Sequence, residues 1–183
     1  MIKRIEDPGE KALISSKELR DFIEKFESEI NRGISALCVL NIIKEAGVNG
    51  NYGYSILKKL REKTNDILVI EEGTLYPLLR KLEKEKIINS KRQEVDGRLR
   101  KNYFMTEIGL KVFDRMSGFY SVLTESIAPL FDVKVDLNQD KYHYCPMCAN
   151  RVSLDIKNVN FCDACGYNIK NDIKKRRAEH EGK

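Results

Sequence analysis

The sequence of 183 residues contains no apolar stretch as long as the ~20 residues that a membrane-spanning helix needs. The amino terminus, MIKRIEDPGEKALISSKELR, also lacks the apolar core of a secretory signal peptide. These absences predict a cytoplasmic protein without a membrane partner.

Residues typical of enzyme active sites are scarce as well. The chain has only 2 histidines, no glycine-rich loop that could cradle a phosphate, and no nucleophile with an identifiable base partner. We therefore expect no catalytic residues and no enzymatic activity.

Cysteine is rare except near the carboxyl end. Four of the 5 cysteines form two close pairs, CPMC and CDAC, whereas Cys38 stands alone in an apolar helical pattern. A secreted disulfide-rich domain spreads its cysteines over the fold, so close pairs in an intracellular chain indicate a metal site. Cys38 is interpreted as a small buried apolar residue.

The paired cysteines, Cys145, Cys148, Cys162 and Cys165, follow the pattern C-x2-C-x13-C-x2-C. Each pair can hold one ion through a tight turn, and two such turns complete the tetrahedral site that zinc favours. Short strand-like stretches, RVSLDI and YNIK, accompany them and predict a small β zinc ribbon with a structural zinc. Iron held by four thiolates and two redox-active dithiols are the alternatives. His143, beside the first pair, is interpreted as a surface residue.

Apolar spacing predicts helices in the first half of the chain. One is expected from Ser15 or Ser16 to about Gly33, a second over residues 34–46 and a third over residues 52–63. Charged residues dominate the first, whereas the second has an apolar stripe wide enough for a nearly buried helix.

The stretch EEGTLYPLLRKLEKEK places glycine and proline inside a helical pattern. The conflict disappears if the helix begins between Glu72 and Thr74, because Pro77 then lies in or near the first turn, where backbone donors have no helical partner. Gly73 then occupies the entry, where unusual backbone angles or close approach by another molecule are easiest. Four leucines form a core-facing stripe, and a tyrosine with two basic residues forms the opposite face. The stripe is Leu75, Leu78, Leu79 and Leu82, and the opposite face is Tyr76, Arg80 and Lys84.

Two candidate strands follow, joined at Asp96–Gly97, a strong signal for a two-residue hairpin turn. From Arg80 to Lys101 there are nine basic residues against four acidic ones. Three helices and a basic hairpin describe a winged helix-turn-helix, in which the last helix enters the DNA major groove and the hairpin lies beside it. A leucine stripe is core in almost any protein, and a basic hairpin is equally typical of a solvated sheet edge. The prediction of a winged helix-turn-helix therefore depends mainly on the order of the elements.

After the hairpin, Thr106 and Glu107 open a long helix, TEIGLKVFDRMSGFYSVLTESIAPLF, whose apolar stripe fits a partner helix. The expected fold class is mainly α with a small β hairpin, a long dimerisation helix and a small β zinc ribbon. The expected segments are an amino-terminal helical extension (1–33), the winged domain (34–105), the dimerisation helix (106–131), a linker (132–141), the zinc ribbon (142–170) and a charged tail (171–183).

Three motifs, YGYSILKKL, EEGTLYPLLRKLEKEKII and DGRLRKNYFMTEIG, occur in this order between about Ile34 and Phe131. In these motifs and their order the segment resembles the PadR family of winged-helix transcriptional regulators. The resemblance implies a homodimer held by the 106–131 helix, often with the amino-terminal helix, that binds a roughly palindromic double-stranded DNA operator and usually represses transcription. The helix before Gly33 and the cysteine module lie outside the usual plan of that family.

Pattern and resemblance together predict a set of DNA-binding residues on the third helix and the hairpin. The set is Gly73, Thr74, Tyr76, Arg80, Lys84, Arg98, Arg100 and Lys101. The resemblance also allows an apolar or aromatic effector near Phe113, Phe119 and Tyr120, although aromatic residues at this spacing are usually core. The alternative function is a protein-interaction adaptor of the transcription machinery that uses the zinc ribbon as its docking surface.

Overall fold

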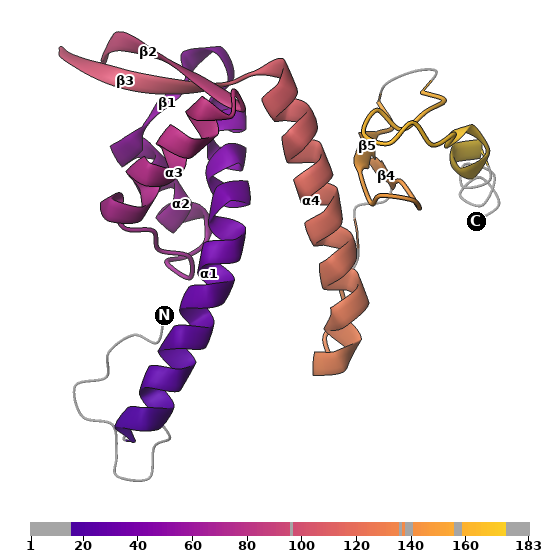
Figure 1. Cartoon of the computed structure of the whole chain (residues 1–183), viewed down its shortest axis with the longest axis horizontal. Helices are drawn as coiled ribbons and strands as arrows, with labels where there is room; N and C mark the ends of the chain where they lie inside the picture. Colours follow the sequence, from indigo (N-terminus) through magenta and orange to yellow (C-terminus); the bar gives the residue numbers. More distant parts are fainter. Residues whose placement is uncertain (1–15, 96, 136, 138–140, 156–158, 175–183) are drawn as a thin grey trace. The chain divides into compact units, whose positions relative to one another are not determined.

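The computed structural model describes residues 16–95, 97–135, 137, 141–155 and 159–174. The chain divides into two compact units, Met1–Thr106 and Glu107–Lys183, whose elements are labelled in Figure 1. None of the helices in these described ranges has both the length and the apolar character required to cross a membrane.

The first unit begins with one long helix, α1 (Lys17–Ala46), where the sequence pattern predicts two. The Ser16 hydroxyl caps it by accepting a hydrogen bond from the Leu19 N–H at 3.4 Å, and Gly47 ends it at φ +53°. The predicted break at Gly33 is wrong, since the helix runs through this residue and a Cβ there would meet nothing within 4 Å. A single glycine costs a helix only about 1 kcal/mol, which the buried carboxyl-terminal half of α1 outweighs.

A helix-turn-helix follows α1. It consists of a short 3-10 helix, η2 (Gly47–Asn49), the strand β1 (Asn51–Tyr52), α2 (Gly53–Lys63) and α3 (Glu72–Lys84). The start of α3 confirms the prediction, with Glu71 in extended conformation at the N-cap.

The core of this unit takes one face from each helix. α3 buries three of the four predicted leucines, with Leu75 and Leu79 at 0% exposure and Leu82 at 6%, whereas Leu78 is half-buried. Residues of α1, of α2, of the segment before α3 and of the sheet complete the core: Val39, Leu40, Ile42, Ile43, Ile56, Leu60, Leu68, Ile70, Ile88 and Tyr103. Truncating a leucine at such a position to alanine costs about 2–5 kcal/mol, so this packing fixes which face of α3 remains outside.

Pro77 lies in the second turn of α3, later than the position that the sequence reasoning favours. It has no N–H for the carbonyl of Gly73, four residues earlier, so the helix forgoes one hydrogen bond there. Gly73 itself has no positive φ, which excludes an unusual backbone angle as the reason for glycine at this position.

The wing is the hairpin of β2 (Ile88–Val95) and β3 (Arg98–Met105), which pair antiparallel. β1 adds to the other edge of β3, giving the sheet order β1-β3-β2. Gly97 has φ +71°, as the predicted turn requires, whereas Asp96 lies outside the described residues. The predicted winged helix-turn-helix is confirmed.

The second unit begins with α4 (Glu107–Ile127), followed by a 3-10 helix, η3 (Ala128–Phe131). The predicted α-helix therefore ends one turn early. Pro129 is the reason, because a proline disfavours helical backbone at the residue before it. Asp132, in left-handed conformation at φ +56°, ends the turn.

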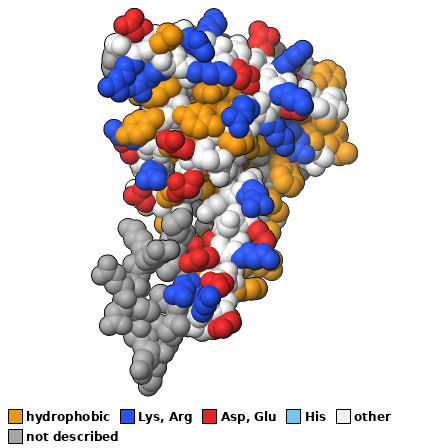
Figure 2. All heavy atoms as spheres, turned by 60° about the vertical axis from the view of Figure 1, so that its left-hand side comes forward, with side chains coloured by type: hydrophobic (Ala, Val, Ile, Leu, Met, Phe, Trp, Pro, Cys, Tyr) orange, Lys and Arg blue, Asp and Glu red, His pale blue; other side chains and the backbone are white. Residues whose placement is uncertain are grey.

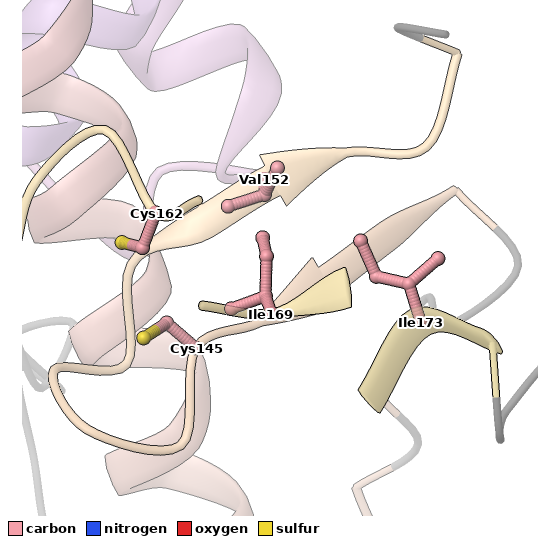
Figure 3. Packing of buried hydrophobic residues seen from close by; sticks show 5 residues of the cluster. All are labelled: Cys145, Val152, Cys162, Ile169 and Ile173. Atoms are coloured by element: carbon pink, nitrogen blue, oxygen red, sulfur yellow. The ribbon is translucent and has the colours of Figure 1, made fainter. Parts of the chain in front are cut away.

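A small ribbon completes the second unit. β4 (Tyr142–Tyr144) pairs antiparallel with β5 (Arg151–Ser153), and a further bridge joins Phe161 to Asn168. Its core consists of Cys145, Val152, Cys162, Ile169 and Ile173, which converge in Figure 3. Ile173 packs here although the expected boundary places it in the tail, most of which lies outside the described residues, as does part of the expected linker.

Candidate nucleic-acid interface and metal centre

The outer face of α3 is open to solvent. The leucine stripe turns inward, and this leaves the five predicted DNA-binding residues of the helix exposed: Gly73, Thr74, Tyr76, Arg80 and Lys84. A Cβ at Gly73 would meet nothing within 4 Å. Figure 2, turned so that the left-hand side of Figure 1 comes forward, shows Lys and Arg side chains spread over the upper part of the view, with apolar and acidic side chains between them.

The first turn of α3 offers fewer unpaired donors than the sequence reasoning assumes. The N–H groups of Thr74 and Leu75 both donate to the carbonyl oxygen of Glu71, each at 2.9 Å. Direct anion binding by these two amides is therefore excluded in this conformation, and any affinity for phosphate there rests on earlier donors and on the helix dipole.

Tyr76 is held against the start of α2 by the absence of a side chain at Gly53. A Cβ on Gly53 would lie 2.6 Å from the Tyr76 hydroxyl oxygen and 2.8 Å from its ring. The ring therefore lies on the first turn of α2, while 38% of the residue remains exposed. This contact within the domain orients the tyrosine on the outer face before any ligand binds.

The three predicted residues of the wing differ in their surroundings. Arg98 is exposed near the hairpin tip. Arg100 is half-buried, with its guanidinium carbon 4.2 Å from the centre of the Tyr52 ring. Lys101 forms an ion pair of 2.9 Å with Glu83 of α3. Among these three residues, Arg98 is the one for which the described part of the chain shows neither an ion pair nor an aromatic contact.

Glu83 links α3 to the wing. Its carboxylate accepts hydrogen bonds from Lys101 of β3 and from the Ser90 hydroxyl of β2. The Lys101 hydrogen bond, followed by that from Ser90, lowers the pKa of the Glu83 carboxyl below its ordinary value. The carboxylate thus connects α3 to both strands of the wing and offsets one positive charge of the basic surface.

Sequence reasoning missed Tyr52, Gly53 and Glu83 as parts of this surface. The motif YGYSILKKL contains the first two, but only the crossing of α2 and α3 shows that glycine makes room for Tyr76. In the sequence, Glu83 is one of several acids in a charged helix. Its partners on the wing are evident only in the folded structure, where the hairpin packs beside α3.

The four paired cysteines come together at one point of the ribbon. Their sulfur atoms all lie within 4.8 Å of one another. The Sγ atoms of Cys145 and Cys165 are 3.7 Å apart, and those of Cys148 and Cys162 are also 3.7 Å apart. Tetrahedral zinc with Zn–S bonds of about 2.3 Å needs sulfurs about 3.8 Å apart, whereas a disulfide needs about 2.05 Å. The spacing therefore fits four ligands around one ion.

The two cysteine turns have the same backbone geometry. Ala149 N–H donates to the Cys145 carbonyl at 2.7 Å, and Gly166 N–H donates to the Cys162 carbonyl at 2.8 Å. The two donors follow the second cysteine of their turns and have positive φ, 56° at Ala149 and 74° at Gly166. The predicted sharp turns after each pair are confirmed, and this doubled turn is what aims four sulfurs at one centre.

The pKa values of the paired cysteines differ with their surroundings. Burial raises the pKa of Cys145 and raises that of Cys148 to about 12. The Tyr167 N–H donates to the sulfur of Cys165, which is exposed, and this hydrogen bond lowers its pKa. Buried thiols of raised pKa are poor nucleophiles, and a bound dication supplies the charge that would hold them as thiolates.

Other residues considered from the sequence have different surroundings. His143 is 7% exposed and lies in β4, so its interpretation as a surface residue is wrong. Cys38 is half-buried, and burial raises the pKa of its thiol, as expected for a small apolar residue. Phe113 is 3% exposed, whereas Phe119 and Tyr120 are 52% and 43% exposed.

The helix order, the exposed basic face of α3 and the hairpin that follows it define a winged helix-turn-helix DNA-binding protein. Residues 39–115 match the family described as the transcriptional regulator PadR-like family. The chain belongs to this family, and this makes it a DNA-binding regulator of transcription, a class that is generally not enzymatic.

Relatives support this assignment. An uncharacterised protein of Lysinibacillus sphaericus is 36% identical over 83 residues, which cover 45% of this chain and 73% of the relative. A PadR family transcriptional regulator from Eggerthella lenta has a crystal structure with 28% identity and a TM-score of 0.55, covering 64% of this chain and 98% of that one. A PadR-like transcriptional regulator of Bacillus cereus has a crystal structure with 26% identity and a TM-score of 0.51, covering 58% of this chain and 99% of that one. The family match over residues 39–115 includes none of the four paired cysteines.

Proposed function

We propose that the protein is a cytoplasmic homodimer that binds a specific, roughly palindromic operator in double-stranded DNA and represses transcription, with one structural zinc in each ribbon. The observation that carries this proposal is the outer face of α3, where Tyr76 and Arg80 stand exposed opposite the buried leucines Leu75, Leu79 and Leu82. The wing that follows α3 in the chain carries a further exposed cation, Arg98.

In the proposed complex α3 lies in the major groove with its first turn nearest the bases. Gly73 and Thr74 allow close approach of the DNA, and the Tyr76 hydroxyl donates to a phosphate oxygen. Arg80 reaches a phosphate or the two acceptors of guanine, and Lys84 contacts the backbone farther along the groove. Arg98, Arg100 and Lys101 hold the flanking strand; Tyr52 orients the Arg100 side chain, and Glu83 offsets part of the Lys101 charge.

Support for the dimer comes from apolar side chains on α4 that nothing covers within the described part of the chain. Phe119, Leu123 and Ile127 recur every four residues and are 52%, 42% and 40% exposed. A stripe at this spacing is typical of helix–helix pairing. A two-fold dimer would place its two copies of α3 in successive major grooves, about 34 Å apart, which requires an operator with two half-sites.

Zinc is supported by the four sulfurs, by their spacing and by the two matched turns. All four protein ligands are thiolates, so no position remains for a water or substrate, and the ion would contribute folding free energy to a ribbon with a very small core.

The test begins with selection of bound fragments from random DNA, with and without a zinc chelator, followed by affinity measurements on the selected operator. Arg80→Ala and Arg98→Ala are each expected to weaken binding by about 1–3 kcal/mol and to reduce the salt dependence, because each removes one contact per half-site. Lys25→Ala is the matched control. It removes the same charge from the exposed amino-terminal half of α1, the end away from the wing (Figure 1). An operator-linked reporter then measures repression.

The proposal fails if Arg80→Ala and Arg98→Ala bind the selected operator as tightly as the Lys25→Ala control. It fails for repression alone if the reporter output rises when the protein is present. Binding that is tight but insensitive to salt would contradict the phosphate contacts.

A second candidate function is a protein-interaction adaptor that docks through the ribbon. The observation that favours it is the exposure of Met147 and Phe161, 68% and 59%, at the two cysteine turns. Met147→Ser with Phe161→Ser should abolish recruitment of transcription machinery while leaving operator affinity unchanged if the ribbon is the docking surface. Unchanged recruitment would exclude this function.

A further inference from the structure

The ribbon packs directly on α4, within the second unit, with β5 beside the middle of the helix (Figure 1). Gly118 makes this contact possible. A Cβ at Gly118 would lie 2.1 Å from the Ala149 carbonyl oxygen and 2.5 Å from the Arg151 nitrogen. Real Cβ atoms do not approach backbone so closely, so any other residue would displace the ribbon from the helix.

Arg151 sets the orientation of the ribbon on the helix. Its guanidinium lies 2.9 Å from the Asp114 carboxylate of α4. The guanidinium carbon also lies 4.4 Å from the centre of the Tyr142 ring and 5.4 Å from that of Phe113. The Arg151 side chain is only 14% exposed, so this ion pair is screened less by water than a surface pair. We call Asp114, Gly118 and Arg151 the ribbon seat.

The backbone that meets Gly118 belongs to the first cysteine turn. Ala149 follows Cys148 directly, and its N–H donates to the Cys145 carbonyl at 2.7 Å. The Cys145 N–H in turn donates to the Asn150 carbonyl at 2.9 Å. The surface that fits Gly118 is therefore the outside of a turn whose inside presents two of the four sulfurs.

The ribbon seat and the exposed apolar stripe occupy different faces of α4. Asp114 and Gly118 are four residues apart and share a face. Phe119, Leu123 and Ile127 lie roughly 100° or more around the helix from Gly118. The ribbon therefore leaves the stripe uncovered, and the same helix supports both contacts.

We propose that the ribbon seat couples zinc to dimerisation: zinc holds the first cysteine turn in the shape that fits Gly118, the seated ribbon keeps α4 folded, and the folded α4 presents its stripe to the second copy. The inference deepens the proposed function and rests on it for the role of the dimer and the operator. Loss of zinc then releases the turn, loosens α4 and weakens operator binding without touching α3 or the wing.

The test uses the full chain and three kinds of measurement: hydrogen exchange of the α4 amides, the dimer dissociation constant by sedimentation, and zinc content. Each is made with zinc and after chelation. Gly118→Ala blocks the seat without weakening the helix, because alanine favours helix more than glycine. Arg151→Ala breaks the ion pair, and Asp114→Arg with Arg151→Asp restores it in reverse. Lys111→Ala is the matched control, since Lys111 is an exposed cation on the same helix.

Chelation of zinc from the wild type is expected to speed hydrogen exchange in α4 and to raise the dimer dissociation constant, each by about tenfold or more, because zinc binding supplies folding free energy to the ribbon. Gly118→Ala and Arg151→Ala should show this faster exchange and weaker dimer while still holding one zinc per chain. The reversed pair should recover part of the loss, and Lys111→Ala should match the wild type.

The coupling is overturned if Gly118→Ala and Arg151→Ala keep wild-type exchange in α4 and a wild-type dimer, or if chelation leaves both unchanged. A chain that holds zinc and binds its operator but shows no such response refutes the coupling alone. A chain whose α4 responds to zinc while no operator is bound supports the ribbon seat and refutes the proposed function.

Discussion

Gly73→Ala should separate folding from DNA binding. A Cβ at Gly73 would meet nothing within 4 Å, and the residue has no positive φ. Alanine is therefore accommodated without strain, and its higher helix propensity should raise the free energy of unfolding by about 0.5–1 kcal/mol. The same Cβ projects from the first turn of α3, which the proposed complex places against the DNA, so operator affinity should fall.

The size of the effect on binding follows from the dimer. Each copy of α3 would carry the extra methyl group, so even ~1 kcal/mol per half-site lowers the affinity by about 30-fold in total. Urea unfolding measures stability, and fluorescence anisotropy with labelled operator measures affinity. Gly53→Ala is the contrasting variant, because its Cβ would lie 2.6 Å from the Tyr76 hydroxyl oxygen and should destabilise the domain.

Either of two results would refute this reasoning. A Gly73→Ala protein less stable than the wild type would show that the space beside Gly73 is not open. A stabilised protein with unchanged operator affinity would show that the first turn of α3 does not approach DNA closely.

Three further predictions concern the wing and α4. Glu83→Gln frees the charge of Lys101 and should tighten operator binding by about three- to tenfold, with a steeper salt dependence in an anisotropy titration. Because the pKa of Glu83 is lowered in the folded state, the wild type should have its full ion-pair stabilisation above the ordinary value of 4.5 and lose it as the pH falls through the folded value. Urea midpoints of wild type and Glu83→Gln should therefore differ at neutral pH and converge in acid. Leu123→Glu places a charge in the exposed stripe of α4 and should convert the dimer to monomers in sedimentation, with the fold of the winged domain unchanged by circular dichroism.

Matched variants accompany these predictions. Glu62→Gln removes an exposed acid of α2 whose carboxylate lies 3.8 Å from the Lys58 ammonium of the same helix, and it should leave operator affinity near wild type. An equal gain from Glu62→Gln would show that total charge, not the Glu83 link, controls binding. Lys111→Glu places a carboxylate at an exposed position of α4 about 120° around the helix from Leu123; monomers from this variant as well would remove the special role of the stripe.

Local sequence determined the elements of the winged domain. The leucine spacing fixed the start and the buried face of α3, and Gly97 fixed the hairpin turn, because periodicity and turn chemistry act over a few residues. The cysteine spacing likewise placed four sulfurs around one point, since each pair lies within a single tight turn.

Tertiary packing decided what depends on residues far apart in the chain. α1 continues through Gly33 because its second half is held in a core that the local pattern does not describe. Lys101 is tied to Glu83, and Tyr76 rests on Gly53, because the hairpin and α2 fold back onto α3. The ribbon seat at Gly118 is of the same kind. From the sequence alone, a glycine inside a helix indicates only low helix propensity. The structure explains Gly118, because the backbone of the first cysteine turn occupies the space of a side chain there.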